Sequence, residues 1–416
     1  MYRPNNQIRN IGFHAADRAS RCYSACMNLI NFDTDVFLRE YWQKKPLLIR
    51  DAWDAWHNPL DPDDLAGLAC ENDVESRIIT QARKALKVEQ GPIAEQRFGK
   101  LGRAPYTLLV QAVDQHIAEV AALIAPFRFV PNWRIDDVMV SYASDGGGVG
   151  AHFDQYDVFL IQGLGQRRWQ VGAHGDGACD NDTELLPHDD LRLLANFEPV
   201  EEWVLNPGDM LYVPPRVAHN GVAVGDDCMT YSIGFRAPSR SELIAHYCDH
   251  LLAELDDDDR YTDPDLPAQD NPGEITPTAL SKLHAMVTQK LADQAAFARW
   301  FGAYTSTPKS PDIDWQPDEP VTVKALHDML TSGAMLRRNP ASRFSFVRQG
   351  DAVVLFVDGE AYDCAGAVGA FAERLCAADQ FEVGPALAIS DDVEVLLVAL
   401  CNCGSVSVSV SFDQED

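Results

Sequence analysis

The chain contains 416 residues, of which 46% are hydrophobic, and its formal net charge is -29. The length predicts two or three domains, and the hydrophobic content is enough to build buried cores. The negative charge opposes direct binding to phosphate backbones and favours a basic protein partner, so we expect no direct contact with nucleic acid.

Neither a membrane span nor an extracellular destination is indicated by the sequence. The longest apolar stretches, such as 395–401, are much shorter than a bilayer-spanning helix, and the first six residues lack the apolar core of a signal peptide. The cysteine pairs Cys22/Cys26 and Cys401/Cys403 are too isolated to form a four-ligand zinc site. We therefore expect reduced thiols and a cytoplasmic location.

The first recognisable element follows an N-terminal extension, residues 1–26, that matches no element. Asp33 or Thr34 is expected to cap a helix. The apolar side of this helix contains Val36, Phe37, Tyr41 and Trp42. Residues 45–50 then predict a strand.

A strand-like segment after a glycine run contains the residues best suited to chemistry. Alternate side chains of an extended strand share a face, so His152 and Asp154 should point the same way. A turn signal at 207–209 and the apolar run after it would deliver His219 just past the end of a second strand. Two histidines and one carboxylate can occupy one triangular face of an octahedral metal and leave its other positions open. This pattern predicts a non-haem ferrous iron site.

Two observations limit how far this pattern can be taken. A set of two histidines and a carboxylate with one open position also suits hydrolytic zinc, which is the competing metal. The same His-x-Asp spacing occurs at His174 and Asp176, and again at His188 and Asp190, but in sequence rich in Gly, Asp and Asn and without an apolar strand. We interpret both of these pairs as solvated loop residues.

The strand after the first two ligands is expected to turn at 163–165 and to return as a second strand. In that second strand Arg167, Trp169 and Val171 share a face. An arginine that points into an apolar barrel beside the metal could hold a dicarboxylate by a two-pronged, charge-assisted contact. The alternative is a surface arginine, and Arg168 must be exposed if Arg167 is internal.

Beyond Pro238 the pattern changes to helix. Ser239 can cap a helix over 242–255, and Thr276-Pro277 can open a second helix with one apolar stripe. The stripe consists of Leu280, Leu283, Val287 and Leu291. The helical segment predicted for 241–305 could therefore pack within the chain or form a dimer interface.

The last part of the chain predicts a separate module after a linker at 306–320. We expect, in order, a helix at 323–330, a hairpin at 343–357, a helix at 365–375 and two strands within 393–411. Residues 311–416 include 6 basic and 18 acidic residues, so a nucleic-acid-binding wing is not expected. We interpret the module as a scaffold or a protein-contact surface.

Several of these segments together resemble a known family. The segments 131–137, 146–159, 167–169 and 231–238 are similar to the JmjC-type ribosomal oxygenases of the cupin superfamily. The resemblance is dense over roughly residues 30 to 300 and is looser after that. It is strongest to the bacterial branch, the arginine hydroxylases that act on a large-subunit ribosomal protein.

The resemblance implies an α+β fold with three parts. The first is a double-stranded β-helix, or jelly-roll, core of the JmjC/cupin type at 27–240 with N-terminal helices and strands. The second is a helical dimerisation domain at 241–305, which implies a homodimer. The third, after the linker at 306–320, is a winged-helix-like domain at 321–416.

The resemblance also implies a set of cofactors and their ligands. Fe(II) would be bound by His152, Asp154 and His219, and 2-oxoglutarate would be the cosubstrate together with O2. Arg167 would hold the far carboxylate of 2-oxoglutarate. The related animal histidine hydroxylases resemble a version with lysine in that role, so arginine favours the bacterial branch.

The substrate arginine is implied to lie near Asp137, Met139 and Tyr156, and to be hydroxylated at C3. The residue types agree with this, because Asp137, Met139 and Ser141 alternate onto one face of an expected strand and an aspartate could bind a guanidinium group. Asp137 could equally be a solvated residue at the end of the strand.

One position departs from the pattern of the cupin metal motif, which usually reads Gly-x5-Pro-x-Gly-x2-His. This chain has Gly208, Pro214 and His219 at that spacing, but Arg216 stands where the second glycine is expected. A glycine often marks a backbone angle that other residues resist. We therefore expect a somewhat different shape for the His219 loop, with more effect on substrate fit than on the metal.

Alternative functions remain open at this stage. Within the same chemistry they are histidyl hydroxylation and lysine demethylation. From another class, the chain could be a metal-free cupin binder or an assembly scaffold. A zinc hydrolase is the least favoured alternative, because Arg167 would then have no evident task.

Overall fold

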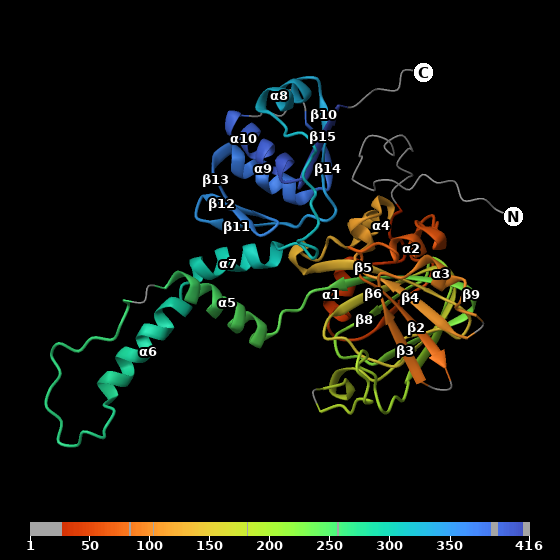
Figure 1. The fold of residues 1–416 in the computed structure, drawn as a ribbon, viewed down its shortest axis with the longest axis horizontal. Helices are drawn as coiled ribbons and strands as arrows, with labels where there is room; N and C mark the ends of the chain where they lie inside the picture. Colours follow the sequence, from red (N-terminus) through yellow and green to blue (C-terminus); the bar gives the residue numbers. More distant parts are fainter. Residues whose placement is uncertain are drawn as a thin grey trace.

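The computed structural model describes residues 27–82, 85–102, 104–180, 182–255, 258–383 and 390–410. The predicted N-terminal extension at 1–26 lies outside the described residues. Figure 1 shows a strand-rich unit and a smaller C-terminal unit, with helix α7 beside the smaller one, helix α5 beside α7, and helix α6 reaching away from both units. No helix in the described ranges is long and apolar enough to cross a membrane.

The strand-rich unit begins with helix α1 (Thr34–Glu40), which Asp33 caps through a hydrogen bond from the Val36 N–H at 2.9 Å. This confirms the predicted cap. Phe37 is buried against Phe159 and Tyr212, with ring centroids 5.3 and 4.8 Å away. The helix therefore packs directly on the strands that carry the candidate site.

Short helices and strands then lead to the main sheet. They are α2 (Pro62–Leu68), β2 (Ser76–Ala82), β3 (Ala85–Gln90), α3 (Glu95–Phe98), β4 (Tyr106–Val110), η1 (Val113–Gln115), α4 (Ala118–Ala121), η2 (Ala122–Phe127) and η3 (Asn132–Arg134). The remaining strands of the unit are β1 (Leu47–Ile49), β5 (Ile135–Ala143), β6 (Asp157–Val171), β7 (Glu201–Leu205), β8 (Met210–Val213) and β9 (His219–Phe235). A short helix, η4 (Gly175–Gly177), follows β6.

The sheet has the strand order β1-β8-β6-β9-β5-β4-β2-β3, and β7 pairs with β6. Strands β6 and β9 are antiparallel partners over almost their whole length, from Asp157 opposite Phe235 to Val171 opposite His219. Side chains from these two strands therefore share one interior. The largest hydrophobic core lies in this unit and includes residues of β2, β4, β5, β6, β8 and β9.

The turn expected at 163–165 is wrong, because β6 is a single strand of 15 residues. Its pairing with β9 shifts register between Gln162 and Leu164 and again between Leu164 and Gln166. Gly165 has a φ of +58°, and a Cβ there would lie 2.8 Å from the carbonyl oxygen of Asp227. The glycines thus form bulges, which bend a strand without reversing it.

Helices follow the sheet, as the sequence predicted. Helix α5 (Arg240–Glu254) begins with a capping box between Ser239 and Glu242, and α6 (Pro277–Leu291) begins at the cap Thr276. The apolar stripe of α6 is exposed: Leu280 by 54%, Leu283 by 43%, Val287 by 63% and Leu291 by 43%. Within the described part of the chain, nothing covers this stripe.

Helix α7 (Gln294–Ser306) packs against the first sheet of the C-terminal unit, and a Cβ at Gly302 would collide with the Phe356 ring. The expected end of the helical domain at residue 305 would therefore place α7 in a different domain from the sheet that it contacts. The later elements are α8 (Val323–Thr331), β10 (Ala334–Arg338), β11 (Phe344–Gln349), β12 (Ala352–Val357), β13 (Glu360–Cys364), α9 (Gly366–Ala377), β14 (Gln380–Val383), α10 (Asp391–Asn402) and β15 (Val406–Val410). They include two three-stranded sheets, β11-β12-β13 and β14-β10-β15.

The helix at 323–330, the hairpin at 343–357, the helix at 365–375 and the second of the two strands expected within 393–411, which is β15, are confirmed, but the first of those strands is not. The first of them is helix α10, whose cap Ser390 accepts a hydrogen bond from the Val393 N–H. Its buried side chains include Val393, Leu396, Leu397 and Leu400, which follow a helical period. The apolar run was misleading because a short run fits a buried helix as well as a strand.

Candidate active site

His152, Asp154 and His219 converge on one point. One potential ligand atom from each residue lies within 4.8 Å of the other two, and among the described residues no other such group of three occurs. His219 Nε2 lies 3.7 Å from Asp154 Oδ2, and the centroids of the two imidazole rings are 4.4 Å apart. The predicted ligands therefore meet in space, although His219 is far from the other two in sequence.

Backbone pairing brings the two histidines together. The His152 N–H donates to the carbonyl oxygen of His219 at 3.0 Å, and the His219 N–H donates to that of His152 at 2.8 Å. The expectation that His152 and Asp154 lie within a strand is wrong in detail, since β6 begins at Asp157. The segment just before β6 is held instead by this bridge and by the Arg216 N–H, which donates to the carbonyl oxygen of Asp154 at 2.7 Å.

The glycine run before His152 lets the chain pass close to neighbouring strands. A Cβ at Gly147 would collide with the carbonyl oxygen of Tyr106, and one at Gly148 would lie 2.5 Å from that of Gly221. A larger residue at Gly147 would push the segment away from β4, and one at Gly148 would push it away from β9. The run therefore sets the position of the first metal ligand.

Hydrogen bonds orient both imidazole rings. His152 Nδ1 lies 2.9 Å from the carbonyl oxygen of Gly150, and His219 Nδ1 lies 3.0 Å from that of Val217. These contacts leave both Nε2 atoms free to bind a metal. Burial, and then the neighbouring His152, hold the pKa of His219 below its usual range, so the imidazole is neutral and suited to metal ligation at neutral pH.

Arg167 lies inside the barrel, and the alternative of a surface arginine is wrong. Arg167 is 2% exposed and shares the interior face of β6 with Trp169 and Val171, whereas Arg168 is exposed. Its guanidinium lies 5.7 Å from the centroid of the Trp169 ring, and that ring lies 5.9 Å from the His219 ring. The cation is therefore close to the metal ligands.

The hydrogen-bonding capacity of Arg167 is largely unused. Its Nη2 lies 3.5 Å from Ser141 Oγ, and its Nε has no partner in the described structure. A buried cation with an unpaired donor is costly unless an anion binds it. Arg167 thus has the donor set that a carboxylate ligand requires.

Asp137 and Tyr156 both lie close to Gly234. Asp137 Oδ1 and Tyr156 Cε2 each lie 3.9 Å from the position of a Cβ on Gly234. Asp137 is 4% exposed, so its interpretation as a solvated residue is wrong, whereas Tyr156 is 43% exposed. Met139 lies between Asp137 and Ser141 on the same strand and is half-buried.

The sequence reasoning missed Lys309, whose Nζ lies 2.7 Å from Asp137 Oδ2. Lys309 belongs to the stretch that composition marked as a linker. A single lysine among Ser, Thr and Pro residues gives no periodic signal of a buried contact, so the sequence could not have identified it.

Arg216 adopts the backbone conformation that the missing glycine would favour. Its φ is +66°, in the left-handed region, so the expected change of loop shape does not arise at this residue. The Arg216 Nε donates to the carbonyl oxygen of Cys179 at 2.6 Å, and the Cys179 N–H donates to that of Arg216 at 2.8 Å. These bonds help to hold a conformation that is unfavourable for a residue with a Cβ.

The two other His-x-Asp pairs lie outside the site, as predicted. His174 and Asp176 are exposed beside the short helix η4. His188 is half-buried, its Nε2 lies 3.1 Å from the carbonyl oxygen of Leu86 and its Nδ1 accepts from the Asp190 and Leu191 N–H groups, so its interpretation as a solvated residue is wrong. Neither pair joins a group of potential metal ligands in the described part of the chain.

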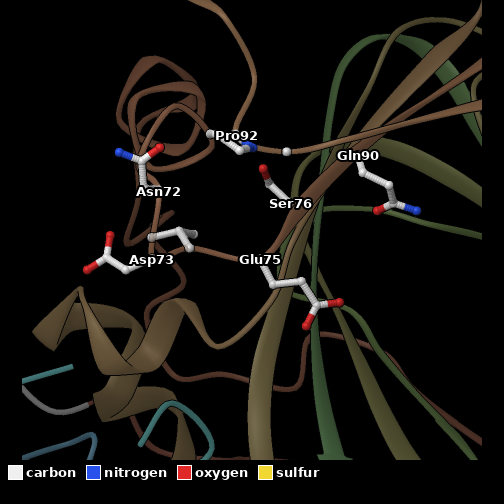
Figure 2. A pocket seen from close by; sticks show the side chains of 8 residues that line it. Asn72, Asp73, Glu75, Ser76, Gln90 and Pro92 are labelled. Atoms are coloured by element: carbon white, nitrogen blue, oxygen red, sulfur yellow. The ribbon is translucent and has the colours of Figure 1, made fainter. Parts of the chain in front are cut away.

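A cavity of about 300 Å³ lies at the start of β2 and the end of β3, and none of the candidate site residues lines it. Figure 2 shows Asn72, Asp73 and Glu75 on the chain that enters β2, with Gln90 on the facing segment. A smaller cavity of about 50 Å³ shares Asp73, Val74 and Glu75 with it and is also lined by Lys309. The smaller cavity thus adjoins the Asp137 side of the candidate site.

Comparison with known proteins agrees with this geometry. A family model described as "JmjC domain" matches residues 122–243, and one described as "ROXA-like winged helix" matches 289–406, which includes α7. Ribosomal protein uL16 3-hydroxylase of Escherichia coli is 38% identical over 333 residues, which cover 79% of this chain and 84% of that protein. A probable ribosomal oxygenase of Haemophilus influenzae is 40% identical over a region that covers 64% of this chain and 66% of the Haemophilus protein.

Solved structures of E. coli YcfD are similar over 92% of this chain. One of them covers 100% of the YcfD chain with a TM-score of 0.82 and 34% identity. Another, in complex with cobalt and 2-oxoglutarate, covers 99% of the YcfD chain with a TM-score of 0.79 and 34% identity. The fold is thus α+β, with a JmjC jelly-roll core sheet and a C-terminal ROXA-like winged helix. The chain belongs to the JmjC-domain ribosomal oxygenases and lies close to the bacterial uL16 3-hydroxylase.

Proposed function

We propose that this protein is an Fe(II)- and 2-oxoglutarate-dependent oxygenase that hydroxylates the ribosomal protein uL16 at C3 of an arginine residue. The observation that carries the proposal is the convergence of His152, Asp154 and His219 beside the buried guanidinium of Arg167, whose Nε has no hydrogen-bond partner among the described residues. The similarity to the E. coli uL16 3-hydroxylase, and to YcfD bound to cobalt and 2-oxoglutarate, supports the same activity.

In this proposal His152, Asp154 and His219 hold Fe(II) as a facial triad. The donor set fits, because both Nε2 atoms are presented by rings that backbone carbonyl groups fix. When bound, iron supplies with 2-oxoglutarate and O2 the oxidising power to insert one oxygen atom into a C–H bond, as the cosubstrate becomes succinate and carbon dioxide. The protein supplies position and electrostatics.

Arg167 orients the cosubstrate by binding the carboxylate that is remote from the metal. Its unpaired Nε and its weakly engaged Nη2 provide two donors for this contact. Trp169 and Val171 line the same face and are almost fully buried, so they exclude water from the ion pair. An ion pair in such an environment is stronger than one in water.

Asp137 would bind the guanidinium of the substrate arginine, with Met139 and Tyr156 beside it. Asp137 Oδ1 faces the Gly234 and Tyr156 side and accepts no hydrogen bond from the described residues, which leaves it available to a cation. A net charge of -29 favours the approach of a basic ribosomal protein. A ribosomal substrate would place the reaction in the cytoplasm.

A homodimer through the helical segment is the corresponding proposal for assembly. The stripe of Leu280, Leu283, Val287 and Leu291 on α6 is exposed, and these residues would be buried by a second copy of the chain. Exposed apolar stripes on helices that extend from a protein are typical of association surfaces. The C-terminal module at 321–416 would then act in protein contact and not in nucleic-acid binding.

Incubation of the protein with recombinant uL16, Fe(II) and 2-oxoglutarate in air tests the activity. We expect succinate formation, together with a gain of one oxygen atom on an arginine of uL16. Oxygen on a histidine would indicate a histidyl hydroxylase, and loss of a methyl group from lysine would indicate a demethylase. The proposal would be refuted if a metal-loaded sample showed neither cosubstrate turnover nor a mass gain.

A binding measurement separates the oxygenase from the two other classes. Anaerobic loading with Fe(II), followed by titration with 2-oxoglutarate, should give a visible absorption that depends on the cosubstrate. A scaffold would show no such absorption. A zinc hydrolase would retain zinc through purification and would not turn over 2-oxoglutarate.

A further inference from the structure

The stretch between α7 and α8 is in contact with the oxygenase unit. Lys309, three residues after α7, places its Nζ 2.7 Å from Asp137 Oδ2 and 3.4 Å from Asp136 Oδ2. Its side chain is 24% exposed, so most of its apolar stem is covered. The stretch therefore contributes a cation to the region where the substrate is proposed to bind.

The contacts of Asp137 divide between its two carboxylate oxygens. Oδ2 accepts hydrogen bonds from Lys309 at 2.7 Å, from the Ala112 N–H at 2.9 Å and from Gln111 Nε2 at 3.4 Å. Oδ1 accepts none from the described residues and lies on the side of Gly234 and Tyr156. One oxygen is thus held, and the other faces the candidate active site.

The position of Lys309 is fixed by contacts that involve the C-terminal unit. Arg343 Nη2 and Arg236 Nε each donate to Asp136 Oδ1 at 3.1 Å. Arg236 also donates to the carbonyl oxygen of Thr305 at 2.7 Å, at the end of α7. Asp136 of the oxygenase unit is therefore connected by these bonds to the C-terminal unit and, through Arg236, to the end of α7. Lys309 extends from the backbone just after this end of α7.

We propose that Lys309 is a positioning residue for the protein substrate, which holds Asp137 Oδ2 so that Oδ1 stays turned toward the cationic side chain of the substrate. The inference rests on the proposed function, in which Asp137 binds the substrate arginine. It assigns a role in substrate binding to the segment between the oxygenase and winged-helix parts.

The charges around Asp137 make Lys309 important for this role. Burial raises the pKa of Asp137, and the adjacent carboxylate of Asp136 raises it further, whereas Lys309 is the nearby cation that lowers it. The buried Asp114 and the hydroxyl of Tyr156 also interact electrostatically with Asp137. Without Lys309, a buried carboxyl among acidic groups would bind a proton and lose its attraction for a guanidinium.

Substitution of Lys309 tests the proposal in the full-length, iron-loaded protein. Lys309→Met removes the charge, Lys309→Arg retains it, and Lys324→Met removes an exposed lysine of the C-terminal unit as a matched control. The measurements are kcat and KM for recombinant uL16, KM for 2-oxoglutarate, and the rate of cosubstrate turnover without uL16.

We expect Lys309→Met to raise KM for uL16 about tenfold. KM for 2-oxoglutarate and the turnover without uL16 should remain as in the wild type. The increase in KM should be larger at lower pH than at higher pH, because the carboxyl group of Asp137 ionises again as the pH rises. Lys309→Arg should restore most of the affinity, and Lys324→Met should match the wild type.

An unchanged or lower KM for uL16 in Lys309→Met would overturn the inference, and a lower value would identify Lys309 as a competitor of the substrate. An equal loss of all rates, with no rescue by Lys309→Arg, would also overturn it, because that result indicates a structural role. A wild type that turns over 2-oxoglutarate but does not modify uL16 contradicts the proposed function itself, so the two failures are distinguishable.

Discussion

His152 and His219 are bridge partners whose backbones exchange two hydrogen bonds, and their imidazole rings lie 4.4 Å apart. This pairing sets the distance between two ligands that are widely separated in the sequence. Main-chain hydrogen bonds maintain the arrangement, so the protein does not have to gather its ligands when the metal binds. The entropy cost of metal binding is correspondingly small.

Removal of a triad residue should abolish both metal binding and turnover. We expect His152→Ala and Asp154→Ala to lose at least about 100-fold in activity. Both variants should also lose the cosubstrate-dependent absorption of the anaerobic iron complex. His174→Ala, which removes a histidine of a similar but exposed motif, is the matched control. Wild-type iron affinity in His152→Ala would contradict the assignment.

Arg167→Met should weaken the binding of 2-oxoglutarate more than that of the protein substrate. Loss of hydrogen bonds to a charged carboxylate costs about 1.5 to 3 kcal/mol, which predicts a rise in KM for 2-oxoglutarate of about 10- to 100-fold. Steady-state kinetics with 2-oxoglutarate as the varied substrate measure this rise. Arg168→Met changes the exposed neighbour and should have no effect. Equal KM values in the two variants would exclude the proposed role of Arg167.

Arg216→Gly and Arg216→Ala should differ in stability. Glycine removes the left-handed strain, which is about 1 kcal/mol for a residue with a Cβ, whereas alanine retains it, and both variants lose the side-chain bond to Cys179. Chemical denaturation should therefore show Arg216→Gly to be more stable than Arg216→Ala by about 1 kcal/mol. Both variants should bind iron. A more stable Arg216→Ala would show that strain at this residue is negligible.

Asp114→Asn should stabilise the protein in a pH-dependent way. Burial, and then the neighbouring Asp137, raise the pKa of Asp114 to about 7, while the Val138 N–H donates to its carboxyl at 2.8 Å. A folded-state pKa above the unfolded one means that the folded state binds more protons between about pH 4 and 7, so stability falls as pH rises through this range. Asparagine keeps the acceptor oxygen and removes this dependence.

We expect the free energy of unfolding of Asp114→Asn to exceed that of the wild type by roughly 4 kcal/mol at pH 8. The difference should shrink toward pH 5, where the native carboxyl is protonated. Urea denaturation at both pH values measures it. Asp312→Asn, which neutralises an exposed carboxylate, is the control. A difference that is equal at pH 5 and pH 8 would argue against a proton-linked cost at this site.

Charges on the α6 stripe should break the proposed dimer. The double variant Leu283→Lys and Val287→Lys places two cations on an apolar surface that a partner would bury, which is unfavourable. Light scattering after size exclusion should then report a monomer, whereas Gln289→Lys on the same helix should remain a dimer. A monomeric wild type at micromolar concentration would contradict the proposed assembly.

Much of the candidate site could be predicted from local patterns. The interior face shared by Arg167, Trp169 and Val171 follows from strand alternation, which holds wherever one face of a strand is buried. The caps Asp33 and Ser239 were identified because a helix start depends on side chains within a few residues of it. Each of these features is decided by near neighbours in the sequence.

Other features depended on contacts that no local pattern contains. The glycines at 163 and 165 are compatible with a turn or with bulges, and continuous pairing of β6 with β9 selects the bulges. Helix α10 is a helix because its apolar side packs into the core of the C-terminal unit. In both places the sequence permitted two conformations, and packing decided between them.

The sequence by itself determined the chemistry of this protein: two histidines, a carboxylate and, through strand alternation, an inward arginine. The tertiary structure alone decided what surrounds them. Lys309 contacts Asp137 across 172 residues of sequence, and the stretch that composition marked as a linker thereby becomes part of the site. Periodicity and spacing report only neighbours along the chain, whereas this contact depends on how the parts that contain the two hydrophobic cores pack together.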